Sequence, residues 1–145
     1  MGQTITEWQL RGAALCQTLH WLAAGAVDAE RLTRTYLDAV AQSQERLNAF
    51  VAIDAAGAET QAREADARRA QGKAIGRLDG VPVAVKDNID VAGLPTQAGM
   101  PGARAPATRD AAVVERLRGA GAVILGKTGM DEGPGADAKY TEPPP

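Results

Sequence analysis

The sequence has 145 residues and a formal net charge of −2, with acidic and basic residues interspersed along its length. A chain of this size can form one domain with a real core, and its charge gives no electrostatic footprint for nucleic acid or an acidic membrane surface. No apolar run approaches the roughly 20 residues of a membrane-spanning helix, and a single cysteine, Cys16, excludes an internal disulfide. We expect a cytoplasmic protein without nucleic-acid or membrane partners.

Two helices are predicted in the N-terminal part of the chain. The run Thr6-Glu7-Trp8-Gln9 is a capping box, which predicts a first helix from about Glu7 to Ala24, ended by Gly25. Asp28 is the expected N-cap of a second helix. The apolar stripe of that helix is formed by Leu32, Tyr36, Val40 and Leu47.

The middle of the chain is predicted to continue with a strand and an alanine-faced helix. Residues 48–53 have the composition of a strand, and a helix is expected from Asp54 to about Gln71. Aromatic residues make up only 3% of the chain, so helices must pack closely through small side chains. On this helix the small face consists of Ala55, Ala58, Ala62 and Ala65.

A strand, a helix and a second strand are predicted next, which favours parallel pairing and an α/β fold. Residues 81–85 form an unbroken apolar strand typical of a sheet covered on both faces. Asp110 is the expected cap of the helix, which Gly119 and Gly121 close, and residues 122–125 form the second buried strand. Residues 134–145 are rich in proline, so we expect one domain over residues 1–133 and a disordered tail.

The segment from Gly121 to Thr128 satisfies the letter pattern of a phosphate-binding P-loop. Such a loop needs free backbone amides between a strand and a helix, whereas the four apolar residues between these glycines are typical of a strand. A P-loop nucleotide binder therefore remains only as an alternative. No cofactor and no metal are expected.

An ordered set of motifs resembles the N-terminal part of the amidase signature hydrolases. The segments that carry the resemblance, over residues 28 to about 133, are Leu47-Asn48-Ala49-Phe50, Gly80-Val81-Pro82, Lys86-Asp87-Asn88, Thr96 with Gly99, and Gly126-Lys127-Thr128. The resemblance implies an α/β fold with helices packed on a mixed, largely parallel sheet. The family's Gly-Lys-Thr-Asn-Met run has Gly129 here in place of asparagine.

The resemblance also implies that Lys86 is the catalytic lysine of a Ser-cisSer-Lys triad that cleaves carbon-nitrogen amide bonds. A lysine at the end of a buried strand, surrounded by Val83, Val85 and Ile89, is expected to point into a pocket, partly removed from water, where a neutral amine can act as a base. The chain contains one serine, Ser43, placed in a polar run of a predicted helix with no base or glycine elbow nearby. We therefore expect a truncated amidase that is inactive alone.

Other interpretations of the chain stay open. It can be a non-catalytic remnant acting as an interaction module, or part of the amidase component of a glutamyl-tRNA amidotransferase. The partners expected are a small carboxamide substrate in the complete enzyme, and either a second copy of the chain or a complementing C-terminal half. His20 and Cys16 lack companion residues and are not expected to form a site.

Overall fold

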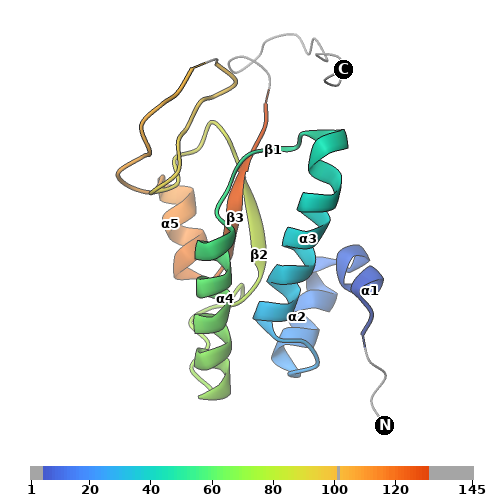
Figure 1. The fold of residues 1–145 in the computed structure, drawn as a ribbon. Helices are drawn as coiled ribbons and strands as arrows, with labels where there is room; N and C mark the ends of the chain where they lie inside the picture. The colour runs from blue at the N-terminus through green and yellow to red at the C-terminus, as the bar shows by residue number, and fades with distance from the viewer. Residues whose placement is uncertain (1–4, 101, 131–145) are drawn as a thin grey trace.

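A computed structural model describes residues 5–100 and 102–130 of the chain, and the helices pack against a small mixed sheet (Figure 1). The elements, in chain order, are α1 (Glu7–Gly12), α2 (Leu15–Ala23), α3 (Ala29–Leu47), β1 (Phe50–Ile53), α4 (Ala55–Ala70), β2 (Pro82–Lys86), α5 (Ala112–Gly119) and β3 (Val123–Thr128). The expected α/β fold is confirmed. The proline-rich tail predicted over residues 134–145 lies outside the described residues.

The N-terminal region forms two helices, so the prediction of one continuous helix from Glu7 to Ala24 is wrong. The capping box at Thr6 is present, but Ala13 and Ala14 are extended and separate α1 from α2. Gly12 is a weak helix former, and the break allows Leu10 of α1 and Leu22 of α2 to enter the same core. Packing of two apolar residues thus outweighs continuity of the helix.

Helices α3 and α4 lie side by side along the sheet (Figure 1). Asp28 caps α3 as predicted, and Asp66 of α4 accepts hydrogen bonds from the first two amides of α3 at 2.7 and 2.9 Å. On α4 the alanines at 58, 62 and 65 are fully buried, which confirms the predicted small face, although Ala55 is exposed. Leu47, predicted to lie in the apolar stripe of α3, is also exposed because it ends the helix beyond the core.

The sheet has the strand order β1-β3-β2. Strands β2 and β3 are parallel and joined through α5, as predicted, whereas β1 pairs with β3 in the antiparallel direction. Helix α5 begins one residue later than expected, with Ala111 as its N-cap. Asp110 does not cap it, because its carboxylate accepts hydrogen bonds from Ala92 N and Arg118 Nε instead.

Apolar residues on the two faces of the sheet form separate clusters. The larger cluster joins α1 to α4 with Val81, Val123 and Leu125. The smaller cluster consists of Val85, Val91, Val114 and Ile124 and lies on the α5 side. Both faces of the parallel pair are therefore partly covered, which is the arrangement that apolar parallel strands require.

Candidate active site at the end of strand β2

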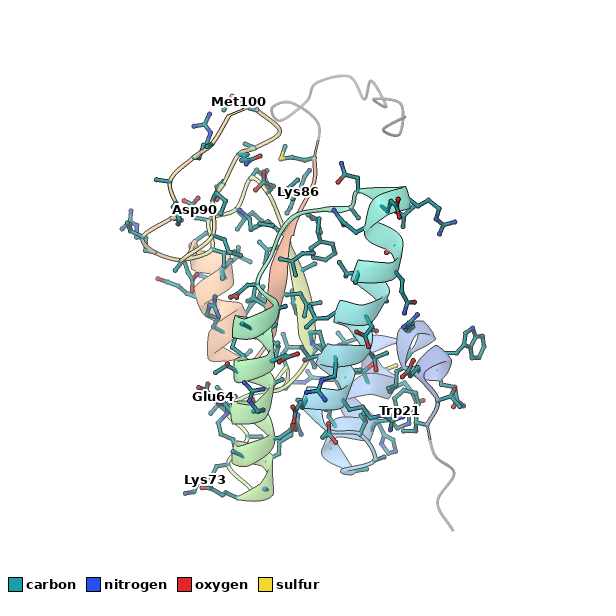
Figure 2. The ribbon with its side chains drawn as sticks, in the orientation of Figure 1. Trp21, Glu64, Lys73, Lys86, Asp90 and Met100 are labelled. Carbon is teal, nitrogen blue, oxygen red and sulfur yellow. The ribbon has the colours of Figure 1, made fainter. Side chains whose placement is uncertain are left out.

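Lys86 is the last residue of β2, at the carboxyl end of the parallel pair, as predicted. Figure 2 shows it at the same end of the molecule as the loop that carries Asp90 and Met100. Its register partner is Thr128, the last residue of β3, so both strands end together. Ligands of open α/β sheets bind outside the carboxyl ends of parallel strands, which makes this end the place where a reactive side chain is expected.

The prediction that apolar residues surround the Lys86 side chain is wrong among the described residues. Val83, Val85 and Ile89 pack in the cluster on the α5 side, whereas Lys86 is exposed. Successive residues of a strand point to opposite faces of the sheet, so Lys86 lies on the face opposite Val85. The apolar residues next to Lys86 in sequence therefore do not surround it.

Asp87 follows Lys86 and is buried, with 1% of its surface exposed. Its backbone amide donates to Thr128 O at 3.0 Å, and its carbonyl accepts from Ala98 N at 3.2 Å. Its Oδ2 accepts from the amides of Gln97 and Ala98 at 3.2 and 3.1 Å. Asp87 thus connects the end of β2 to β3 and to residues ten or eleven positions further along the chain.

Lys127 of β3 is fully buried and pairs with Asp87. Its Nζ lies 3.2 Å from Asp87 Oδ1 and donates to Pro95 O at 3.1 Å and to Thr96 Oγ1 at 2.9 Å. The contact with Oδ1 is an ion pair by distance but is not oriented as a hydrogen bond, and Oδ1 has no other polar partner among the described residues. All contacts of Lys127 Nζ are directed into the protein.

The P-loop interpretation of Gly121 to Thr128 does not agree with this geometry. Residues 123–128 form β3, and this strand is paired on both sides, with β1 and with β2. Its amides pair with the neighbouring strands, except that the Ile124 amide donates to Gln61 Oε1 of α4 at 3.1 Å. The lysine that a P-loop would direct at phosphate is buried against Asp87. The predicted strand is confirmed and extends three residues beyond Leu125.

The remaining candidate side chains do not gather at this end of the sheet. Ser43 Oγ donates to Ala39 O at 2.7 Å and to Val40 O at 3.3 Å, both in its own helix. Cys16 and His20 are exposed on α2. Among residues 5–100 and 102–130 no group of acidic, histidine or cysteine side chains could hold a metal ion. No helix in the same residues is both long and apolar enough to span a membrane.

An open hollow of about 600 Å³ lies beside the loop that follows β2. Lys86 does not line this hollow, so the hollow is not the pocket into which the Lys86 amine was expected to point. The lining includes Thr96, the partner of Lys127, together with Asp90, Arg104 and Arg109.

The pair formed by Asp87 and Lys127 is the part of the site that sequence patterns do not predict. The motifs contain both residues but do not indicate that they meet. A signal in the sequence that could have indicated the pair is a lysine near the end of one parallel strand together with a carboxylate directly after the neighbouring strand. Parallel strands bring such residues to the same edge, where a buried lysine requires an acidic partner.

Comparison with known proteins gives consistent results for sequence and structure. The sequence model of the family described as Amidase matches residues 31–139. A glutamyl-tRNA(Gln) amidotransferase subunit from Salinispora arenicola is 46% identical over 114 residues, which cover 77% of this chain and 23% of that protein. AmiA2 of Mycobacterium tuberculosis, a putative amidase by name, is 49% identical over 118 residues, covering 81% of this chain and 24% of its own.

Among solved structures, the peptide amidase of Stenotrophomonas maltophilia has a TM-score of 0.78 and 35% identity. The match covers 83% of this chain and 25% of that one. The chain therefore spans about a quarter of the length of the relatives that it matches.

Proposed function

Because the chain belongs to the amidase signature family, we propose that it contributes the lysine of an amide-bond hydrolase, Lys86, to a triad with two serines. The observation that carries this proposal is the position of Lys86. It ends β2 at the carboxyl edge of the parallel pair, within the Gly80–Asn88 segment that resembles the lysine motif of the family. Strand β2 is also an edge strand among the described residues, so a further strand can pair with the edge of β2 that faces away from β3.

In the proposed reaction the Lys86 amine accepts the proton of a bridging serine, which in turn accepts the proton of a nucleophilic serine. The nucleophilic oxygen adds to the carbonyl carbon of the amide. The carbon-nitrogen bond then breaks as a proton passes to the leaving nitrogen. Water hydrolyses the resulting ester, which restores the serine and releases a carboxylic acid.

Both serines of this triad come from outside the 145 residues in our proposal. The hydroxyl of the only serine, Ser43, is donated to carbonyls of its own helix and lies far from β2 in sequence. The exposure of Lys86 fits the same view, because serines and a substrate must be able to reach its amine. The chain alone is then without hydrolytic activity.

A chimera tests the proposal. Residues 31–130 of this chain would replace the matching part of the Stenotrophomonas peptide amidase, and ammonia release from a peptide amide would be measured. We expect turnover in the chimera and a loss of at least about 100-fold in Lys86→Ala, which is the scale of a lost general base. Lys73→Ala is the matched control, because Lys73 is exposed and its amine contacts Gln71 at the surface.

Turnover that survives Lys86→Ala would show that another group is the base. A folded chimera with no turnover at all would favour the non-catalytic interaction module. The 46% identity to the Salinispora protein supports a second candidate, ammonia transfer to glutamyl-tRNA. Residues 31–130 of this chain would also replace the matching part of the Salinispora protein. Measuring the formation of glutaminyl-tRNA by that chimera separates ammonia transfer from hydrolysis.

A further inference from the structure

We propose that Lys127 is a positioning residue for Lys86, acting through Asp87 to hold the end of β2 and the loop over residues 87–98 in one arrangement. This inference rests on the proposed function only for the role of Lys86. The contacts that carry it belong to residues of β2, β3 and the loop, and they exist whether or not Lys86 is catalytic.

Lys127 carries its charge inside the protein. A lysine with no exposed surface is rare, and an amine removed from water needs partners for its charge and its protons. Lys127 has three, the Asp87 carboxylate, Pro95 O and Thr96 Oγ1. Two of them lie in the loop after β2 and the third lies directly next to Lys86, so a single amine connects β3 to both ends of this segment.

Asp87 transmits this constraint to the backbone of the loop. Its carboxylate is held by Lys127 on one oxygen and by the amides of Gln97 and Ala98 on the other. Ala98 adopts a left-handed conformation with φ 54°, which is unfavourable for a residue with a Cβ. Such a conformation persists where surrounding contacts determine it, and the bonds from Asp87 are those contacts.

Lys86 itself lies between two residues, Val85 and Asp87, that are bound to β3. Val85 is the register partner of Lys127, and the Asp87 amide donates to Thr128 O. The backbone of Lys86 is therefore held on both sides by the same two residues of β3. Its side chain keeps its freedom while its Cα has a defined place at the sheet edge.

Stability alone is a poor explanation for this pair. Replacing a buried ion pair with apolar residues of similar volume is often neutral or stabilising, since desolvation of two charges offsets their attraction. A methionine at position 127 would fill a similar volume but could not bind Asp87, Pro95 or Thr96. What the lysine adds is geometry, and that is the property to measure.

The experiment measures amide hydrogen exchange by NMR in the 145-residue chain. In Lys127→Met we expect exchange of the Gln97 and Ala98 amides to accelerate by at least about tenfold relative to the Leu32 amide of α3, with a changed amide shift at Lys86. Val114→Ala is the control, because it opens a cavity in the α5-side cluster without touching the ion pair. In that variant all these amides should accelerate together.

Chemical rescue separates the amine from the volume of the side chain. Lys127→Cys, made in a Cys16→Ala background and alkylated with 2-bromoethylamine while unfolded, restores an amine of nearly the original length after refolding. We expect this protein to regain the exchange rates and the Lys86 shift of the parent chain. If Lys127→Met does not fold, Thr96→Val removes one partner of the amine and should accelerate the same amides to a smaller extent.

Two results would overturn the proposal. One is that amide exchange accelerates in the same pattern in Lys127→Met as in Val114→Ala. The other is that the exchange rates in Lys127→Met equal those of the parent chain. None of these measurements uses hydrolysis. Failure of the positioning role therefore appears in the exchange rates, whereas failure of the proposed function appears as turnover of the Lys86→Ala chimera.

Discussion

Arg68 and Asp79 form a two-point ion pair that closes the connection between α4 and β2. Arg68 Nη2 lies 2.7 Å from Asp79 Oδ1, and its Nε lies 3.4 Å from Oδ2. Asp79 is fully buried, and Oδ2 also accepts from Ile75 N at 3.1 Å. The pair therefore fixes the turn that leads into β2, the strand that ends at Lys86.

We expect Asp79→Asn to lower the free energy of unfolding by about 2–3 kcal/mol, the scale of a lost charged hydrogen bond with a buried partner. Urea unfolding followed by circular dichroism measures this change. Arg34→Ala is the control, since Arg34 pairs with Glu30 at 57% and 35% side-chain exposure, and should change stability by about 0.5 kcal/mol or less. Equal effects of both substitutions would contradict the structural role of Asp79.

The pH dependence of this pair follows from Arg68. The hydrogen bond to Asp79 raises the pKa of the Arg68 guanidinium, with burial acting in the opposite direction. A base whose pKa is raised by folding contributes stability at every pH below its pKa in the unfolded chain. This stability is lost only as the pH rises through its pKa in the folded chain. Both values lie far above neutrality, so the difference between parent and Asp79→Asn that arises from Arg68 should stay constant from about pH 6 to 9. A fall in this difference toward pH 9 would contradict the assignment.

Gly126 and Gly129 lie three residues apart and should respond in opposite ways to a side chain. A Cβ at Gly126 would lie 2.2 Å from Ala52 O of β1, and its φ of 154° is rare for other residues. At Gly129 the nearest atoms would be at 3.7 Å, an ordinary contact. We expect Gly126→Ala to destabilise the chain by about 2 kcal/mol or more, because β1 must move.

In contrast, Gly129→Asn, which introduces the asparagine of the motif that this segment resembles, should be neutral or stabilising by about 0.5 kcal/mol. Thermal unfolding of the two variants under identical conditions tests both expectations. A destabilising asparagine at 129 would contradict the open space that the structure shows around Gly129.

The sequence could predict what depends on local pattern. The strand at 81–85 and the strand after Gly121 are apolar runs on either side of an amphipathic helix, and that order leads to parallel pairing. The small face of α4 follows from alanines at helical spacing, which is also a local signal.

Contacts between distant residues set the features that local patterns do not predict. The break at Ala13 occurs because Leu10 and Leu22 share one core, and Asp110 turns away from its helix toward Arg118 and the Ala92 amide. Burial of Lys127 and exposure of Lys86 depend on which strand face is covered. None of these features is determined by the neighbouring residues, so the pattern of one segment could not predict them.

Nucleotide binding is testable with the chain itself. Titration with ATP and with GTP in magnesium should give no saturable signal by calorimetry, because the amides of β3 already have partners in the sheet or in Gln61 and Lys127 Nζ is directed at Asp87. Weak binding to exposed cations should be unchanged in Lys127→Met, provided that the variant is folded. Submillimolar affinity that this substitution abolishes would restore the P-loop interpretation.

The isolated chain should not hydrolyse amides. Its single serine donates its hydroxyl to the Ala39 and Val40 carbonyls within α3, and among the described residues neither a histidine nor a lysine accepts from it. Release of ammonia from small carboxamides should therefore equal the rate without protein, and Ser43→Ala should make no difference. Lys86→Ala serves as the second comparison. Turnover lost in Ser43→Ala would identify a nucleophile on α3 and contradict the proposed triad, and turnover lost only in Lys86→Ala would show that Lys86 acts with another nucleophile.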